Sequence, residues 1–415
     1  MMIAKPTWRA VATTAAASLC LTLAACGGGS TGTTSSTAAN CSGETPGVTA
    51  SEIKIGAMSP MTGPAAEHFL GFQDAVKARI DEQNAQGGVN GRKIVVVSGD
   101  DQGDGARQVT TARSLIQDQQ VFAIVATVRN DTMFPFLKQN NVPIFASPSV
   151  PAFGTDRNAF GISGAFAPNA TSTAIADFMK AKGVTRLALT AHNTPGSTGG
   201  AKQAAVAAQA VNLPVGYSPT DIPVGSFDAT ATALRIREDG DDGLYSPLLA
   251  SSAVSLSSAL NAQSVNLKAK LLTGIYDPKV LAQTGSALEG AWGFTTPMKP
   301  LELDDPAVKQ YVKVMNERAA GWVSSPHAGY GYVAADLFIH GLQLAGDCLT
   351  RENYVNTLRE SDGYDGNGLL YEKVQFKPGL TDNGNPPSCN WFVQVKGGSF
   401  TPEPQATCGQ LVKTG

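Results

Sequence analysis

Adjacent aspartates and one serine–lysine spacing are among the residues of this sequence whose types could support acid–base or nucleophilic chemistry. Asp100-Asp101 and Asp304-Asp305 are neighbours, and neighbouring side chains point to opposite sides of an extended chain. We therefore expect solvated acids in a turn and at a helix start. Ser51 and Lys54 lie at the entrance to a predicted strand, whereas serine–lysine catalysis needs both groups on one helical turn. With no H-E-x-x-H motif and no G-x-S-x-G motif at the end of a predicted strand, the sequence indicates that the protein is not an enzyme.

A glycine-rich stretch, NAQGGVNGRKIVVVSGDDQ at residues 84–102, raises the question of a nucleotide-binding loop. A phosphate-binding loop must follow a strand and open a helix, because the helix N-terminus supplies the amide groups. Residues 87–91 instead follow a predicted helix and lead into a strand. We interpret Gly87 or Gly88 as the helix C-cap and Asn90-Gly91 as a tight turn. We expect no cofactor and no metal, because the histidines are too far apart in sequence to pair as ligands on one helix: His68, His192, His327 and His340.

The elements that must position any site follow an alternating pattern. Near-continuous apolar runs predict buried parallel strands, and amphipathic segments between them predict helices. The first series of strands is predicted at 53–58, 93–100, 122–127 and 143–147, and a second series at 186–191, 243–249 and 268–274. Further helices are predicted at about 171–182, 199–211, 306–320, 328–345 and 351–360, and strands at 369–376 and 391–401, the last a hairpin turning at Gly397-Gly398. Two successive βαβ series predict an α/β fold with two doubly wound lobes.

Ligands of an open α/β sheet bind at the loops that follow the carboxyl ends of its strands. Four such loops are polar or rich in glycine and proline, at 59–63, 128–132, 147–149 and 191–196, and two more at 251–252 and 276–277 would face them across a cleft. The alternative is that these small polar residues only cap helices. The candidate ligand-binding residues on these loops are Thr62, Arg129, Asn130, Asp131, Thr132, Ser147, Ser149, Asn193, Ser252, Tyr276 and Asp277.

The N-terminal residues predict export and a lipid anchor. Lys5 and Arg9 precede an apolar run that is too short for a transmembrane helix, and the run ends in Leu23-Ala24-Ala25-Cys26. This tetrapeptide resembles the bacterial lipoprotein box, which implies a signal peptide at 1–25, cleavage before Cys26 and a lipid on its sulfur. Residues 26–51 would then be a flexible tether that holds the protein to the extracytoplasmic face of the cell membrane. A net charge of −3 without a basic run argues against nucleic-acid binding.

The six cysteines agree with an oxidising compartment. Cys20 would leave with the signal peptide and Cys26 would carry lipid. The remaining four allow three pairings, and they are too scattered for a zinc site: Cys41, Cys348, Cys389 and Cys408. In the predicted hairpin, residue 389 would lie opposite roughly residue 406, so a bond from Cys389 to Cys408 is within reach.

Several segments resemble one known family. IKIGAMSPMTGP, GFQDAVKARIDEQNAQGGVNGRKIVVVSGDDQGDGARQVTTARSLI, NNVPIFASPS, GLQLAGDCLTRENYVNTL and VQVKGGSF are similar to the leucine/isoleucine/valine-binding family of extracytoplasmic solute-binding proteins. These are type I periplasmic binding proteins that serve ABC importers. The similarity runs from about residue 53 to residue 401.

The resemblance implies two Rossmann-like lobes joined by three hinge crossovers. The first lobe would take residues 52–165 and 298–373, and the second 166–297 and 374–415. This topology implies disulfides within lobes, Cys389 with Cys408 and Cys41 with Cys348, because such bonds leave the hinge free.

In relatives that bind amino acids, first-lobe loops hold the carboxylate, and a second-lobe carboxylate with aromatic residues holds the ammonium group. By position the first set maps to Asn130, Asp131, Thr132, Ser147 and Ser149, and the second to Tyr276 and Asp277. Residues 193–196 replace the usual tyrosine-glycine motif, aromatic residues are absent near 251–252, and the Arg129 loop is more charged than usual. The solute could therefore be a branched-chain amino acid or another small acid or amide.

Two side-chain roles stay open at this point. Arg129 could pair with Asp131 to stabilise the loop, or bind an acid through two hydrogen bonds. Tyr330, Tyr332 and Trp322 could be core or rim residues, or could stack on a solute. The resemblance implies a receptor that delivers a small-molecule solute to ABC permease subunits by lobe closure. A ligand sensor on the same fold is the alternative, and a lipid-anchored hydrolase lacks a nucleophile–base motif.

Overall fold

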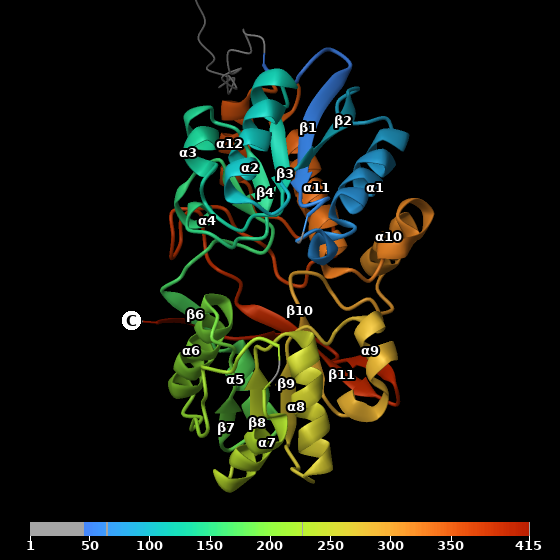
Figure 1. The fold of residues 1–415 in the computed structure, drawn as a ribbon. Coiled ribbons are helices and arrows are strands. Elements are labelled where there is room, and N and C mark those ends of the chain that lie inside the picture. Colours follow the sequence, from blue (N-terminus) through green and yellow to red (C-terminus); the bar gives the residue numbers. More distant parts are fainter. Residues whose placement is uncertain (1–44, 64, 226, 415) are drawn as a thin grey trace, which may run out of the picture. The chain divides into compact units, whose positions relative to one another are not determined.

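The computed structural model describes residues 45–63, 65–225 and 227–414, and Figure 1 shows two β-sheets in this part of the chain, each with its own helices. We call each sheet, together with the helices packed against it, a lobe. Both lobes are α/β, as predicted. Among the described residues, no helix has the length and apolarity needed to cross a membrane. The predicted signal peptide, Cys26 and Cys41 lie outside the described residues.

The first sheet is entirely parallel and has the order β2-β1-β3-β4-β5. The four predicted strands of the first series are confirmed, and a fifth short strand was not predicted. The strands are β1 (Glu52–Ser59), β2 (Lys93–Asp100), β3 (Ala123–Ala126), β4 (Ile144–Ala146) and β5 (Ala159–Gly161). Because β1 is a central strand, its apolar residues are buried on both faces of the sheet.

Helices cover both faces of the first sheet because side chains alternate along each strand. Phe145 of β4 belongs to the core on one face, whereas its neighbours Ile144 and Ala146 belong to the core on the other. The first core takes side chains from α1 (Phe72–Ala85), α10 (Pro306–Arg318), α11 (Pro326–Ala345) and α12 (Arg351–Glu360). The second takes them from α2 (Gly105–Arg113), η2 (Ser114–Asp118), α3 (Phe134–Gln139) and α4 (Ala152–Thr155).

The buried pair Arg79–Asp336 joins helices α1 and α11 across the first core. The guanidinium Nε donates to the Asp336 carboxylate at 2.7 Å, and the Tyr364 hydroxyl donates to the other carboxylate oxygen at 2.8 Å. Burial alone would lower the pKa of Arg79, but Asp336 raises it above its ordinary value. The two helices are thereby held together by residues 257 positions apart in sequence.

The second sheet has the order β12-β11-β10-β9-β8-β7, with β13 paired to β11. Its strands are β7 (Leu187–Leu189), β8 (Gly243–Ser246), β9 (Ala269–Leu272), β10 (Trp292–Thr295), β11 (Cys389–Lys396), β12 (Ser399–Pro402) and β13 (Thr407–Cys408). The first four run parallel, whereas β11 runs antiparallel to β10. Its faces are covered by α5 (Ala174–Ala181) with α6 (Pro195–Ala210), and by α7 (Ala229–Glu238) with α8 (Ala250–Ala262) and η3 (Gly285–Leu288).

The chain passes between the lobes three times among the described residues: from β5 to β6, from β10 to α10, and before β11. β6 (Ala170–Ser172) pairs with the C-terminal strand β14 (Leu411–Lys413) in a separate two-stranded sheet. The predicted strand at 369–376 is wrong, because this segment has only isolated bridges at Leu370 and Val374.

We propose that the third passage lies later than the lobe boundary at residue 373 that the resemblance implies. Val374 and Phe376 are buried in the first core. The buried Arg359 guanidinium donates to the carbonyls of Phe376 and Asn383, both at 3.3 Å, and to that of Ala159 at 2.6 Å. These contacts bind residues 376–383 to the first lobe. We therefore propose that the second lobe resumes just before Cys389.

The glycine-rich stretch is a structural turn, as predicted. Gly88 has φ of 81°, and a Cβ atom there would lie 2.0 Å from the carbonyl oxygen of Arg92. The Asn84 side chain accepts from the Ile94 amide at 2.8 Å and donates to the Ile94 carbonyl at 2.7 Å. Asn84 thus ties the end of α1 to the start of β2, at the amino edge of the sheet.

The predicted hairpin and its disulfide are both present. β11 turns into β12 at Gly397-Gly398, and both glycines have positive φ. Cys389 is bonded to Cys408, directly opposite it in the antiparallel register. Val393 pairs with Pro402, and this register, continued without a break, would place residue 406 opposite Cys389. The returning chain has two extra residues after Pro402, so Cys408 lies opposite Cys389 instead. Cys348 is also disulfide-bonded, and its pairing with Cys41 stays a prediction.

Candidate ligand-binding site

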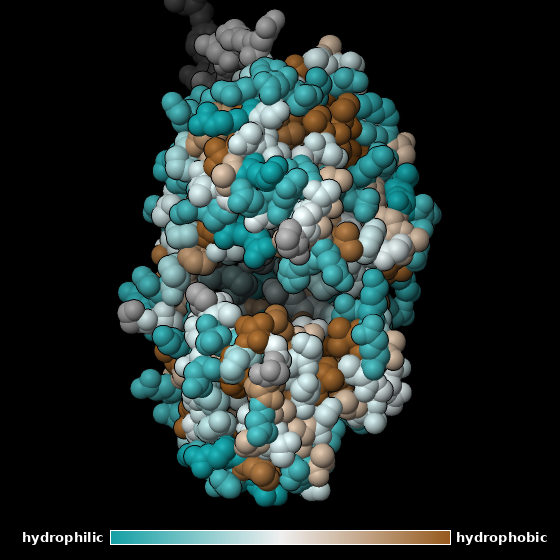
Figure 2. Space-filling model, in the orientation of Figure 1, coloured by the Kyte–Doolittle hydropathy of each residue, from teal (hydrophilic) through white to brown (hydrophobic). Residues whose placement is uncertain are grey.

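The candidate residues lie on loops at the carboxyl ends of the strands, as the βαβ pattern predicted, except Ser252, which lies in the first turn of α8. β1 and β3 are parallel neighbours that pair Met58 with Ala126, so the loops that carry Thr62 and Arg129 leave the sheet side by side. Tyr276 and Asp277 follow β9 in the second lobe. Figure 2 shows a hollow on this face between the two lobes.

Asp100 fixes the loop after β1. Its carboxylate accepts from the Thr62 hydroxyl at 2.5 Å and from the backbone amides of Met61 at 2.9 Å and Gln102 at 3.0 Å. Partial burial would raise the pKa of Asp100, but these hydrogen bonds lower it below its ordinary value. Thr62 is exposed, although its hydroxyl proton is used by Asp100.

The other predicted turn and helix-start acids have different environments. Asp101 is 1% exposed, so the expectation of a solvated acid is wrong there. It accepts from the Gly103 amide and the Gln108 side chain, and burial raises its pKa. Asp305 caps α10 by accepting from the amides of Ala307 and Val308, as a helix-start acid should.

The loop after β3 is held by its own polar side chains. The Asn130 side-chain oxygen accepts from the Thr132 amide at 3.1 Å, and the Thr132 hydroxyl donates to the Gly105 carbonyl at 3.1 Å. No ion pair joins Arg129 and Asp131, both of which are described and exposed. Of the two roles that the sequence left open for Arg129, the loop-stabilising pair is therefore absent here.

The two serines after β4 differ in their contacts. The Ser149 hydroxyl donates to the Val128 carbonyl at 2.7 Å, which ties this loop to the Arg129 loop. Ser147 is exposed, and no hydrogen bond of its hydroxyl to another described residue is found. Ser147 therefore has a donor that a solute could use.

A group of aromatic rings beside Arg129 was not anticipated as a unit. We call His68, Phe69, Arg129, His327 and Tyr330 the ring–arginine cluster. His68 and His327 have ring centroids 4.6 Å apart, Phe69 lies 4.8 Å from His327, and the Arg129 guanidinium lies 5.8 Å from the Phe69 ring. His327 and Tyr330 belong to the first turns of α11, whereas His68 and Phe69 form the end of η1 (Ala66–Phe69), directly after β1.

The other aromatic residues considered from the sequence divide into core and rim. Tyr332 is 5% exposed and packs edge-on against Tyr311, so it is a core residue. Trp322, at the end of η4 (Ala320–Trp322), is half-buried over Gly71, where a Cβ atom would lie 2.6 Å from the indole ring. Lys279 of the second lobe places its ammonium group 5.4 Å from the Trp322 ring. Trp322 is therefore a rim residue at which the two lobes meet.

Two of the four second-lobe candidates, Tyr276 and Asp277, already make side-chain hydrogen bonds within the protein. The Tyr276 hydroxyl donates to the Glu302 carboxylate at 2.7 Å and accepts from the Leu301 amide at 2.9 Å. Asp277 caps α9 (Pro278–Thr284) by accepting from the Lys279 amide at 2.7 Å. The Ser252 hydroxyl is buried without a hydrogen-bond partner among the described residues, and Asn193 is exposed.

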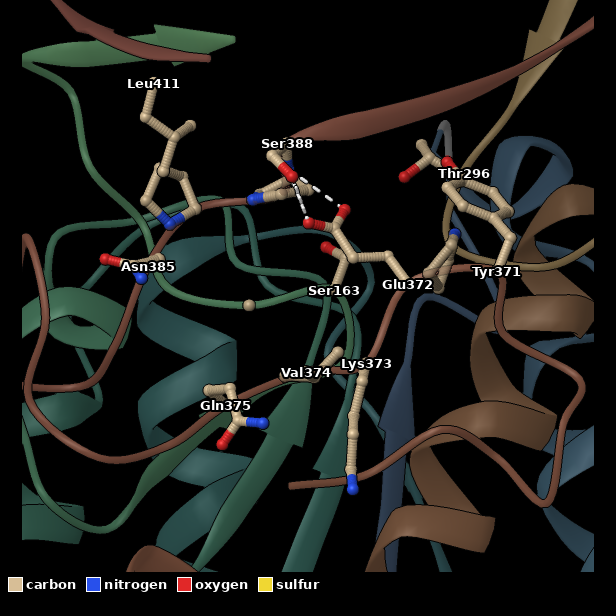
Figure 3. A pocket seen from close by; sticks show the side chains of 14 residues that line it. Ser163, Thr296, Tyr371, Glu372, Lys373, Val374, Gln375, Asn385, Ser388 and Leu411 are labelled. Carbon is tan, nitrogen blue, oxygen red and sulfur yellow. Dashed lines mark hydrogen bonds between the residues drawn. The ribbon is translucent and has the colours of Figure 1, made fainter. Parts of the chain in front are cut away.

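A second space, the hinge pocket, lies where the three passages between the lobes come together (Figure 3). Its volume is about 190 Å³, and it is lined by residues of all three passages, including Ser163, Thr296 and Asn385. The Ala165 amide donates to the Asn385 carbonyl at 2.9 Å, which links the first passage to the third. The pocket therefore marks the hinge.

Tyr371 and Glu372 tie the remaining passages together at this pocket. The Tyr371 hydroxyl donates to the Thr295 carbonyl at 2.7 Å, at the end of β10. The Glu372 carboxylate accepts from the amides of Ser388 at 2.9 Å and Cys389 at 3.0 Å, and from the Ser388 hydroxyl at 2.5 Å (Figure 3). We call this arrangement the hinge clamp. The clamp itself was not predicted from the sequence, because the carboxylate and its donors are separated by a segment without regular structure.

Comparison with known proteins places this arrangement in a recognised group. A family model described as "Periplasmic binding protein" matches residues 52–399. Among curated proteins, a Leu/Ile/Val-binding protein homolog 2 of Brucella abortus is 33% identical over 78 residues, which is 19% of this chain and 21% of the relative. The aligned segment thus spans about a fifth of that relative.

Solved structures share the fold over most of the chain. A branched-chain amino acid ABC transporter protein from Thermus thermophilus with bound valine has a TM-score of 0.69 at 17% identity, and the match covers 86% of this chain and 97% of that one. A fatty acid ABC transporter substrate-binding protein from Thermomonospora curvata has a TM-score of 0.66 at 19% identity, with coverage of 89% and 95%. At these identities the likeness concerns the fold alone. The first protein has valine bound, whereas the second is named for fatty acids.

Proposed function

Because this chain belongs to the periplasmic binding protein family, we propose that it is the solute receptor of an ABC importer. It captures a small amino-acid-like, carboxylate or amide solute between its two lobes and delivers it to permease subunits. The observation that carries this proposal is the placement of polar loops from both lobes at the carboxyl ends of their strands, next to a three-passage hinge. Such loops are where open α/β sheets bind ligands.

Lobe closure supplies the mechanism of capture. A solute that contacts both lobes stabilises the closed arrangement by its differential affinity for it. Lys279 over Trp322 and Tyr276 on Glu302 are contacts that already join second-lobe side chains to residues of the first lobe or the passage leading to it. No bond of the solute is made or broken, and the protein acts as a receptor rather than an enzyme.

The ligand-binding residues follow from the loops. We propose that Arg129, Asn130, Asp131, Thr132, Ser147, Ser149 and Thr62 act from the first lobe, and Asn193, Ser252, Tyr276 and Asp277 from the second. Ser147 and Arg129 have donors without partners among the described residues, whereas Thr62, Thr132 and Ser149 donate their hydroxyl protons within the protein. The latter three therefore shape the loops and offer only lone pairs to a solute.

A solute screen by thermal unfolding tests the receptor function. Full-length protein is scanned with amino acids, short amides, and aliphatic and aromatic acids. A true solute at 100 times its Kd should stabilise the protein by about 2.7 kcal/mol, and calorimetry should give one site per chain. If no compound in these classes raises the Tm, the receptor function is wrong.

We further propose that Cys26 carries a lipid that keeps the receptor near its transporter. The supporting observation is the small-residue sequence before Cys26 and the glycine-, serine- and threonine-rich stretch after it. In cells, Cys26→Ser should release the protein from the membrane fraction into the soluble extracytoplasmic fraction. Retention of the variant in the membrane fraction would argue against the anchor.

A further inference from the structure

The ring–arginine cluster brings three separate segments together at the carboxyl edge of the first sheet. Arg129 follows β3, His68 and Phe69 follow β1 in η1, and His327 with Tyr330 begins α11. β1 and β3 are neighbouring strands, and α11 packs against η1. The cluster therefore lies on the edge of the sheet where this fold binds its ligand.

The Arg129 guanidinium has no partner of opposite charge within the described part of the chain. It is exposed, and no hydrogen bond or ion pair joins it to another described side chain or carbonyl. The guanidinium carbon lies 5.8 Å from the centroid of the Phe69 ring, which is 9% exposed. The five N–H donors of a guanidinium form a planar fork, which suits two parallel hydrogen bonds to a carboxylate.

The neighbouring rings are uncharged at neutral pH. Burial, and to a lesser degree Arg129, lowers the pKa of His68. Burial and the neighbouring His68 lower the pKa of His327 to about 4. The exposed His68 and the half-buried His327 thus place neutral rings next to a permanent cation. The charged neighbours in sequence are Glu67 and Asp131, both exposed, and neither pairs with Arg129.

The second lobe, in contrast, has few unused groups for an ammonium ion. The Tyr276 hydroxyl is bonded to Glu302 and Leu301, and one oxygen of the Asp277 carboxylate caps α9, which leaves the other oxygen. A solute with a carboxylate and a ring, but without an ammonium group, would use the partners that are unoccupied.

We propose that the solute is a small planar aromatic carboxylate, whose carboxylate is bound by Arg129 and whose ring packs against His68 and His327. This inference rests on the proposed receptor function and names the solute class for the same site. Offset or edge-on contact between rings supplies attraction beyond the burial of apolar area. The carboxylate supplies the charge-assisted pair.

Three probes separate the parts of this proposal. Benzoate has both the ring and the charge, benzamide keeps the ring without the charge, and cyclohexanecarboxylate keeps the charge without a planar ring. Calorimetry on the full-length protein should give the tightest binding for benzoate. Benzamide should bind about tenfold or more weakly because it loses the charge-assisted pair. Cyclohexanecarboxylate should bind more weakly than benzoate because it loses the contact between aromatic rings. Leucine and valine complete the panel as solutes that carry an ammonium group.

Two arginine variants provide the matched comparison. Arg129→Gln should weaken benzoate by about tenfold or more. Arg113→Gln is the control, because Arg113 is also exposed and its guanidinium also lies over a ring, 4.3 Å from Phe136, but it stands at the far end of α2. Arg113→Gln should leave benzoate affinity unchanged. His327→Leu should remove the preference for benzoate over cyclohexanecarboxylate, while circular dichroism reports an intact fold.

The outcomes distinguish this inference from the receptor function itself. Tight binding of leucine or valine, without binding of benzoate, would overturn the aromatic carboxylate and leave the receptor standing. Equal benzoate affinity in the wild type and in Arg129→Gln would remove Arg129 from the site. If no compound of the panel or of the wider screen binds, both proposals fail.

Discussion

At the residue scale, Asp277 has two separable roles that a single alanine substitution would confuse. Its carboxylate caps α9 through the Lys279 amide, and it is also the second-lobe acid proposed for an ammonium-bearing solute. Asn retains the capping oxygen but removes the charge. The Asn variant therefore isolates the role of charge in binding.

We expect Asp277→Asn to keep the stability of the protein within about 0.5 kcal/mol, and Asp277→Ala to lose about 1 kcal/mol through the missing cap. If the solute is an aromatic carboxylate, Asp277→Asn should bind benzoate as well as the wild type does. Urea unfolding and calorimetry measure the two quantities. A tenfold loss of benzoate affinity in the Asn variant would mean that this acid contacts the solute.

Residue-scale chemistry was only partly predictable from the sequence. The loops were found because polar residues follow apolar strands, and Asp305 was recognised as a helix-start acid. The meeting of His68 with His327 was not, because the two residues are 259 positions apart and only the packing of α11 against η1 unites them. The burial of Asp101 was not predicted either. It depends on how Gln108 and the loop fold around the carboxylate, which the aspartate pair alone does not reveal.

At the element scale, Asp242 joins the amino ends of three strands of the second sheet. Its carboxylate accepts from the amides of Thr185 at 2.8 Å and Arg186 at 2.9 Å, just before β7, and pairs with Lys268 at 2.8 Å, just before β9. Asp242 itself precedes β8. Although burial alone would raise the pKa of this carboxyl, the hydrogen bonds from Lys268 and the amides hold it well below its ordinary value.

We expect Asp242→Asn to lower the free energy of unfolding by about 2 kcal/mol at pH 7. A carboxyl with a lowered pKa stabilises the fold above its unfolded pKa near 4, and this contribution is lost as the pH falls below that value. The wild type and the variant should therefore converge in stability between about pH 4 and pH 2. Urea titrations across this range test the expectation, and a constant difference down to pH 2 would contradict it.

The elements that the sequence predicted best are those whose burial is two-sided. β1, β3 and β4 read as apolar runs because helices cover both faces of the sheet. The segment at 369–376 has a similar apolar and β-branched composition, but Val374 and Phe376 are buried by packing on the first core rather than by pairing in a sheet. Apolar composition indicates that a segment is buried. It does not indicate whether pairing in a sheet or packing on a core buries the segment.

At the scale of the whole molecule, the hinge clamp is the feature that couples the lobes. Glu372 receives three donors from Ser388 and Cys389, at the start of the strand that re-enters the second lobe. A glutamine side chain has one acceptor oxygen and would turn an N–H₂ group toward these donors. The clamp should therefore open in Glu372→Gln.

We expect Glu372→Gln to lose about 1.5–3 kcal/mol of stability and to populate a wider range of lobe angles without solute. X-ray scattering should show a larger radius of gyration than that of the wild type. Glu289→Gln is the control, because Glu289 is exposed and accepts only from the Gly397 amide within the second lobe. Identical scattering from Glu372→Gln and the wild type would show that the clamp does not set the hinge.

The contact of α1 with α11 has a consequence for how the chain acquires its structure during synthesis. Helices α11 and α12 cover one face of the first sheet and the inner side of α1, so these surfaces stay uncovered until residues 326–360 have been synthesised. Arg79 likewise has no ion-pair partner in α11 until Asp336 has been synthesised. Contacts of such long sequence separation form late and leave apolar surface accessible in the meantime. Proteolysis of chains that end before residue 326 should reveal this exposure. Until these residues have been synthesised, the first core is incomplete and the chain is not fully folded. A chain that is not fully folded can still be translocated across a membrane.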